Sequence, residues 1–98
     1  MNEIDLENEL SEKGLLAPRV TPDMIDETIV SAQYYVFPGT TVTTCLLTLR
    51  NGFNVLGESA CASPDNFDVG IGQSLAYENA RDKIWALEGY LLKEKLSR

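Results

Sequence analysis

The sequence predicts an α+β fold, in which a small antiparallel sheet with a central hairpin is flanked by an N-terminal helix and a long C-terminal helix. Three observations predict this fold. Asn51-Gly52 lies between two β-branched, apolar runs and marks a tight hairpin. Thr21-Pro22 has the residues of a helix start, and apolar residues recur at helical spacing from about residue 67 to 96.

The composition predicts one globular domain over residues 21–98, preceded by an acidic N-terminal arm over residues 1–20. The 98 residues are 44% hydrophobic and 23% charged, with a net charge of −7. Residues 1–27 hold eight acids against two bases, a charge of −6, so the body of the chain is nearly neutral. Because it has no basic stripe and no apolar run of about 18 residues, we expect neither a duplex nucleic-acid partner nor a membrane partner.

The N-terminal helix should begin at Thr21, whose hydroxyl can cap it, with Pro22 at its first position. Its core face is predicted to hold five residues at helical spacing: Met24, Ile25, Thr28, Ile29 and Ala32. The arm before it has weak helical spacing, which ends at Gly14 and Pro18. From Tyr34 the pattern becomes that of strands.

A two-residue type I′ loop at Asn51-Gly52 would pair Arg50 with Phe53, so that paired positions sum to 103. Apolar residues then fall on both faces of the ribbon, which must be covered on both sides or shared with a partner. In this register Cys45 and Cys61 lie on opposite faces, so no disulfide is expected between them. The chain has no histidine, and we expect no metal site and no cofactor.

The C-terminal helix is predicted to have two apolar stripes. The expected core stripe is Ala76, Ala80, Ile84, Leu87 and Leu91. Since exposed apolar side chains each forgo about 1.5 to 3 kcal/mol of burial, we expect a homo-oligomer that covers the rest. The alternative is that the N-terminal arm covers the second stripe. The expected interface combines that stripe with two leucines of the hairpin: Trp85, Gly89, Leu92, Leu96, Leu47 and Leu56.

The absence of histidine removes the commonest general base, so we expect a binding protein and not an enzyme. Arg81 and Trp85 are one helical turn apart and, with Arg50, could stack a base and neutralise a phosphate. Alternatively, Arg81 covers Trp85 or pairs with Asp82 or Glu78. Two weaker candidates are Glu58, as a carboxylate for hydrolysis, and the glycines of residues 68–74, as a phosphate-binding helix start.

The segments FPGTTVT, NGF, GESAC and KIW followed by LEGYLL resemble a family of tailed-phage proteins named after gene product 49 of a coliphage and gene 66 of a Shigella phage. The resemblance covers about Thr21 to Leu96. Members commonly have proline where this chain has Ala86 and lack the glycines at 70 and 72, which counts against a phosphate loop. The resemblance implies a phage accessory protein acting in the host cytoplasm and supplies no catalytic residues.

By analogy with other small phage proteins, we expect an oligomeric counter-defence protein that sequesters a host nucleotide signal near Arg50, Arg81 and Trp85. The alternative is a protein that inhibits a host defence enzyme through the acidic arm or the Trp85 stripe. The expected partners are therefore copies of the chain itself and either a small nucleotide or a host protein.

Overall fold

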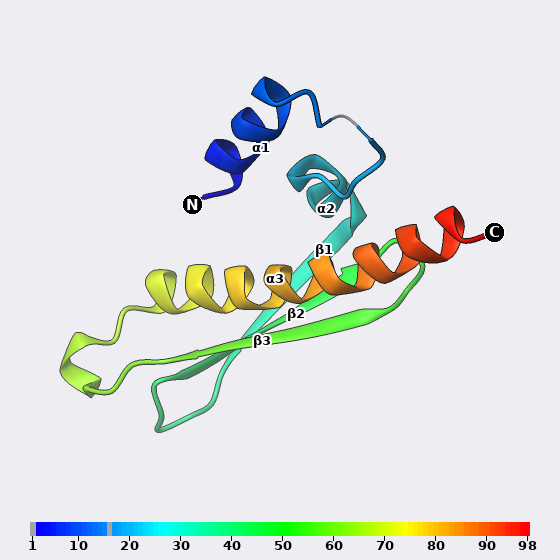
Figure 1. The fold of residues 1–98 in the computed structure, drawn as a ribbon. Coiled ribbons are helices and arrows are strands. Elements are labelled where there is room, and N and C mark those ends of the chain that lie inside the picture. The colour runs from blue at the N-terminus through cyan, green and yellow to red at the C-terminus, as the bar shows by residue number, and fades with distance from the viewer. Residues whose placement is uncertain (1, 16) are drawn as a thin grey trace.

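The structure is a computed structural model that describes residues 2–15 and 17–98. Three strands form one antiparallel sheet in the order β1-β2-β3, and the long helix α3 covers one face of it (Figure 1). This architecture confirms the α+β prediction. The elements in chain order are α1 (Glu3–Glu12), α2 (Pro22–Thr28), β1 (Ile29–Val36), β2 (Val42–Leu49), β3 (Asn54–Ala60), a 3-10 turn (Pro64–Asn66) and α3 (Val69–Leu96).

Helix α2 begins as predicted but is shorter. The Thr21 hydroxyl accepts a hydrogen bond from the Met24 amide at 3.3 Å, and Pro22 lies in the first turn. The helix ends at Thr28, because the β-branched residues that follow it favour extended backbone. Ile29 and Ala32 therefore belong to β1 and not to a helix, which corrects the predicted core face.

The hairpin between β2 and β3 has a three-residue loop, so the predicted two-residue loop is wrong. The Leu49 amide donates to the Phe53 carbonyl at 2.9 Å, and Gly52 takes a positive φ of 89°. This is the hairpin type that closes with a glycine in the left-handed region. Paired positions such as Cys45 and Gly57 sum to 102, one less than predicted.

That shift of one residue reverses the faces of β3 relative to β2. Cys45 and Cys61 fall on the same face, contrary to prediction. Both are nevertheless free thiols, because Cys45 pairs with Gly57, four residues from Cys61 along the chain. The buried face of β2 is Thr43, Cys45, Leu47 and Leu49, and Val55 and Gly57 of β3 lie beside it.

The core forms where α3 crosses this face of the sheet. It consists of Ile25, Cys45, Leu47, Leu49, Val55, Ala76, Ala80 and Ile84. The crossing is close at Gly57, where an added Cβ would lie 2.2 Å from the Ala80 nitrogen and 2.4 Å from the Ala76 oxygen. Small residues on both elements let the backbones touch. Leu47, predicted as an interface residue, is fully buried in this core, and that prediction is wrong.

The apolar excess is present, but other residues than predicted carry it. Trp85 packs partly buried against the core, and Gly89 and Leu92 are half-buried. Leu87 and Leu91 of the expected core stripe are substantially exposed, as are Leu56 and Leu96. The second stripe is therefore not the main exposed surface. Large exposed apolar side chains gather instead on β1 and its loop, at the hairpin tip and on α3: Val30, Tyr35, Phe37, Phe53, Val69, Ile71, Leu75 and Tyr90.

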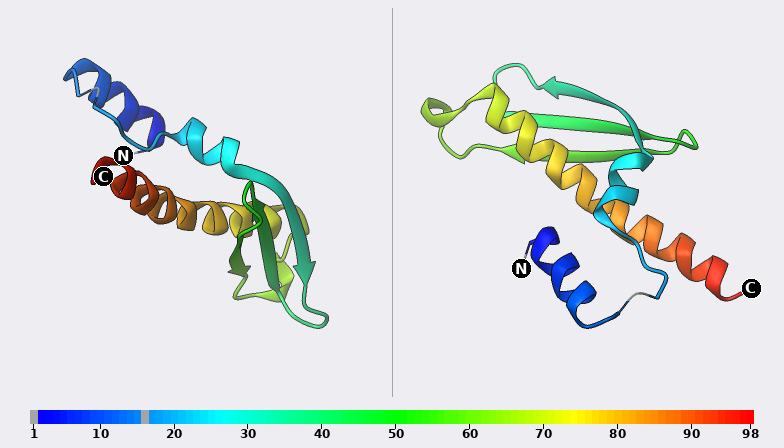
Figure 2. Two further views of the ribbon diagram at one scale, coloured as in Figure 1. Left: turned by 90° about the vertical axis from the view of Figure 1, so that its right-hand side faces the viewer. Right: turned by 90° about the horizontal axis from the view of Figure 1, so that it is seen from above.

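Helix α1 lies apart from the sheet, beside α3 and α2 (Figure 2). It contains no buried residue. Ion pairs connect it to the body: Glu3 binds Arg81 of α3, and Glu7 binds Arg19 in the segment before α2. The acidic arm thus contacts the body mainly through charge.

Candidate functional site

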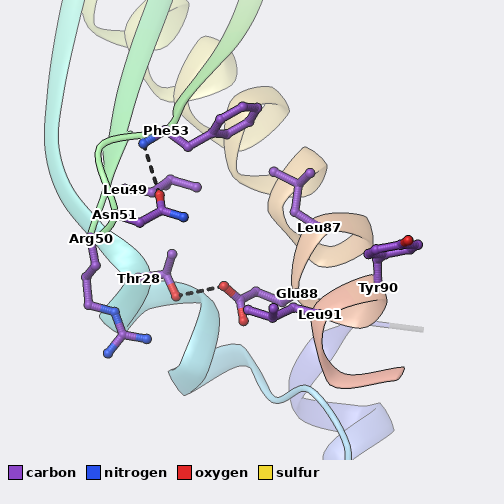
Figure 3. A pocket seen from close by; sticks show the side chains of 9 residues that line it. All are labelled: Thr28, Leu49, Arg50, Asn51, Phe53, Leu87, Glu88, Tyr90 and Leu91. Carbon is purple, nitrogen blue, oxygen red and sulfur yellow. Dashed lines mark hydrogen bonds between the residues drawn. The ribbon is translucent and has the colours of Figure 1, made fainter. Parts of the chain in front are cut away.

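A hollow with mainly apolar walls lies between the hairpin tip and the C-terminal half of α3, and we call it the hairpin cavity (Figure 3). Its volume is about 380 Å³, within the range typical of small-molecule sites. Nine residues line it: Thr28, Leu49, Arg50, Asn51, Phe53, Leu87, Glu88, Tyr90 and Leu91.

The walls of the hairpin cavity follow from the fold. Leu87, Tyr90 and Leu91 are three and four residues apart, so one side of α3 presents all three. The three-residue loop holds Phe53 opposite them (Figure 3). The Phe53 and Tyr90 side chains are 56% and 77% exposed, so their rings are free to contact a flat apolar group.

Two charged groups accompany these walls. Glu88 Oε1 lies 3.4 Å from the Thr28 hydroxyl, whose single proton is also within reach of the Met24 carbonyl at 2.9 Å, so this contact places a carboxylate at the cavity without binding it tightly. The Arg50 amide donates to the Thr28 carbonyl at 3.0 Å and ties the loop to the end of α2. The Arg50 guanidinium lies at the rim, away from the Glu88 carboxylate (Figure 3). The cavity therefore offers an apolar slot, an inner acceptor and an outer cation.

Arg81, a predicted ligand-binding residue, is engaged by the protein itself. Its Nε donates to Asp26 at 2.8 Å, its Nη1 to Glu3 at 2.5 Å, and its Nη2 to the Pro22 carbonyl at 3.4 Å. The hydrogen bonds to Glu3 and Asp26 raise the pKa of Arg81. These partners lie on or beside α1 and α2, so Arg81 is paired as in the alternative prediction, but not with Asp82 or Glu78. A ligand phosphate would have to displace two carboxylates.

The three residues expected to bind a nucleotide do not share one pocket. Arg50 lies at the hairpin cavity, Arg81 lies between α3 and the two N-terminal helices, and Trp85 packs against the core. Sequence reasoning missed Phe53 and Tyr90. The helical spacing of Tyr90 with Leu87 and Leu91 was a signal, but both leucines were expected to be buried.

The two weaker candidates are not supported by their surroundings. The Glu58 side chain is exposed on the face of the sheet opposite α3. At the start of α3, the Asp68 carboxylate already accepts from the Ile71 amide at 2.9 Å and would repel a phosphate. Gly72 is buried, and an added Cβ there would lie 2.9 Å from the Thr43 hydroxyl oxygen. Gly72 therefore serves packing against the sheet.

No group of three potential metal ligands occurs within residues 2–15 and 17–98. In that same part of the chain, none of the helices combines the length and the apolar character needed to cross a membrane.

The fold defines a small α+β protein whose three-stranded sheet is covered on one face by a single long helix, with an apolar cavity at its hairpin. The chain belongs to the Phage protein (N4 Gp49/phage Sf6 gene 66) family, which matches residues 20–96. The resemblance seen in the sequence is thereby confirmed, over nearly the range expected. No curated protein and no solved structure matches the chain.

Proposed function

We propose that this phage protein is a non-enzymatic, oligomeric counter-defence protein that sequesters a nucleotide signal of the host cytoplasm in the hairpin cavity. Its membership of a phage family supports an action inside an infected cell. The observation that supports a nucleotide as the ligand is the combination of exposed aromatic rings with Arg50 at the rim of an apolar hollow.

Each part of a nucleotide has a matching group in this cavity. A base can stack on Phe53 or Tyr90, since base–aromatic stacking is worth about 1 to 3 kcal/mol. Glu88 can accept a hydrogen bond from a base amino group, because a carboxylate is an acceptor only. The phosphate would lie by Arg50 at the rim, away from Glu88. Arg50 thus remains a candidate, whereas Arg81 and Trp85 have structural roles.

Sequestration needs no chemical step. The chain contains no histidine, so it lacks the usual general base, and the cavity contributes one carboxylate and one guanidinium. One carboxylate without a second acid or base is better suited to recognition than to hydrolysis. A binder of this kind acts by lowering the free concentration of its ligand.

The rival proposal, inhibition of a host enzyme through the acidic arm, has less support. Three acids of α1 are already paired within the chain: Glu3 with Arg81, Glu7 with Arg19 and Glu9 with Lys13. The Trp85 ring packs partly buried against the core, so only part of it is free to contact a host protein. Removal of residues 1–18 tests the rival, because an inhibitor that uses the arm would lose its activity.

The ligand is tested by thermal melting of the purified protein with a panel of cyclic mono- and dinucleotides. A ligand at 100 times its Kd stabilises by about 2.7 kcal/mol, which raises the melting temperature of a domain this size by about 10 °C or more. Arg50→Gln and Tyr90→Ala should abolish the shift. Arg98→Gln, which removes the same charge from an exposed position outside the cavity, is the matched control.

Recovery of chemically altered nucleotide would assign the protein to an enzyme class instead. A panel that leaves the melting temperature unchanged would contradict the nucleotide ligand. If Arg50→Gln and Arg98→Gln reduced the ligand-induced rise in melting temperature equally, the ligand would bind outside the hairpin cavity.

A further inference from the structure

The two edges of the sheet differ in whether their outward backbone groups are already satisfied. The Leu49–Phe53 hydrogen bond sets the alternation of the hairpin, so the even-numbered residues of β3 point their carbonyls away from β2. Side chains of α3 reach these carbonyls: Lys83 Nζ donates to Leu56 O at 2.6 Å, and Asn79 Nδ2 to Glu58 O at 2.7 Å. The β3 edge is therefore capped by its own helix.

The β1 edge has no such cap. The Phe37 amide donates to the Val42 carbonyl at 3.1 Å, so Gln33 and Tyr35 bond to β2 while Ala32, Tyr34 and Val36 point their amides and carbonyls outward. Among the residues that the structure describes, no side chain donates to or accepts from these outward groups. No other element lies beyond β1 in the right-hand view of Figure 2.

The sequence of β1 lacks the usual protections of an edge strand. Its eight residues, IVSAQYYV, contain no charge, no proline and no glycine. Native edges are commonly protected by lysine, proline or a bulge. A bulge is present between Ile29 and Ser31, at the end near α2, and it leaves Ser31–Val36 regular. This regular stretch is an open template for another strand.

We propose that β1 pairs antiparallel with β1 of a second copy of this chain, which joins the two sheets into one six-stranded sheet. The inference deepens the proposed function and rests on it for the role of the assembly. A two-fold axis at Tyr34 sets Tyr34 opposite its counterpart and Ala32 opposite Val36 of the partner subunit. Symmetry repeats the pair of Ala32 with Val36, so there are three pairs in all. Each would be hydrogen-bonded, which gives up to about six hydrogen bonds in total.

A second copy fits this edge better than another partner, because a symmetric pair brings identical groups together. The uncharged strand sets no like charges opposite each other. The Tyr34 side chain, 40% exposed in the single chain, would contact its symmetry mate on the α3 side. On the other side, Gln33 would lie opposite the exposed Tyr35. The paired strands thus cover apolar surface as well as backbone.

The register allows a charge-exchange test. Gln33→Lys with Tyr35→Lys, or the same positions changed to Glu, sets like charges opposite each other across the axis. Both side chains are exposed, so the fold should hold, which circular dichroism and melting can verify. Light scattering should give a dimer of the 10.8 kDa chain for the wild type, monomers for each double variant alone, and a dimer again for the mixture.

Two further measurements keep the proposal falsifiable. Gln33→Cys and Tyr35→Cys chains, mixed without reductant, should form a disulfide-linked heterodimer, since non-hydrogen-bonded pairs place Cα atoms about 4.5 Å apart. Lysines at Leu56 and Glu58 on the capped edge are the matched control and should leave the dimer intact.

A monomeric wild type, a lysine variant at 33 and 35 that stays dimeric, or a mixture that stays monomeric would each overturn the pairing. Dissociation by the lysines at 56 and 58 alone would also overturn it. Nucleotide melting shifts report the ligand separately. A dimer without a ligand contradicts the proposed function alone, and a ligand-binding monomer contradicts the pairing alone.

Discussion

Gly57 is the residue that sets the distance between the sheet and its helix. No Cβ fits there, because the backbone of α3 occupies the space at Ala76 and Ala80. A backbone, unlike the end of a flexible side chain, cannot rotate away. The position therefore tests whether the close crossing is as tight as the structure shows.

We expect Gly57→Ala to lower the free energy of unfolding by about 3 kcal/mol or more, because the helix must shift to admit the methyl group. Gly89→Ala is the matched control, since Gly89 lies within α3 and no heavy atom lies within 4 Å of its added Cβ. That change should raise the free energy by up to about 1 kcal/mol through helix propensity. Urea unfolding measures both. Equal effects at the two sites would contradict the close crossing.

The two free thiols lie in different surroundings. Burial raises the pKa of Cys45 above its ordinary value of 9.0, and a hydrogen bond from Tyr34 acts in the opposite direction with smaller effect. Cys61 is half-buried and donates to the Ser63 carbonyl at 3.1 Å. Iodoacetamide near pH 8 should therefore label Cys61 first and Cys45 only on unfolding. Labelling of Cys45 at the rate of a denatured chain would contradict its burial.

The same burial has a consequence for stability. The folded chain holds the Cys45 proton more tightly than the unfolded chain, so the unfolded state loses its proton first as the pH rises through 9.0. Burial also raises the pKa of Tyr34, in the same direction. The free energy of unfolding should thus fall as the pH rises through 9.0 because of Cys45, and fall further above 10.0 because of Tyr34. Cys45→Ala should flatten this dependence, and an unchanged slope would count against the assignment.

At the scale of elements, α1 is joined to the body by ion pairs and not by burial. Arg81 is the centre of this junction, with a side chain only 14% exposed between Glu3 of α1 and Asp26 of α2. None of the ten residues of α1 is buried, so apolar burial contributes little to holding this helix against the body. A short isolated helix is also marginal in water.

Arg81→Gln should therefore release α1 while leaving the sheet and α3 folded. Hydrogen exchange of residues 3–12 should accelerate, and high salt should have a similar but weaker effect on the wild type. Lys13→Gln, which removes a solvent-exposed pair between the C-cap residue of α1 and Glu9, is the control and should change exchange at that pair only. Unchanged protection of residues 3–12 in Arg81→Gln would show that other contacts hold the helix.

For the whole molecule, one face of the sheet and one edge remain uncovered. Tyr35, Phe37 and Leu56 are exposed on or beside the face opposite α3. Tyr35 and Phe37 pack against each other edge to face, with ring centroids 4.8 Å apart. The long helix α3 lies on the other face of the sheet, so it leaves this face without a helical layer.

If the working form is an assembly, the melting temperature should rise with protein concentration, because association stabilises the folded state by mass action. Melting over a 100-fold concentration range measures this directly. The lysine variant at positions 33 and 35 should lose the dependence. A wild-type melting temperature that is independent of concentration would contradict self-association.

Local signals in the sequence determined most of the elements. The Thr21-Pro22 start, the Asn51-Gly52 turn and the spacing of Ala76, Ala80 and Ile84 each act within a few residues, so the chain order and the α+β class could be predicted. The family could be recognised too, since its motifs are short contiguous segments.

Tertiary structure decided the rest. A glycine turn permits either a two- or a three-residue loop, and a difference of one residue exchanged the faces of β3 relative to β2. Leu87 and Leu91 have core spacing, yet α3 extends past the sheet and leaves them at a cavity. Arg81 pairs with Glu3 and Asp26, which are 78 and 55 residues away in the sequence. Such pairs depend on how distant segments pack, so no local pattern predicts them.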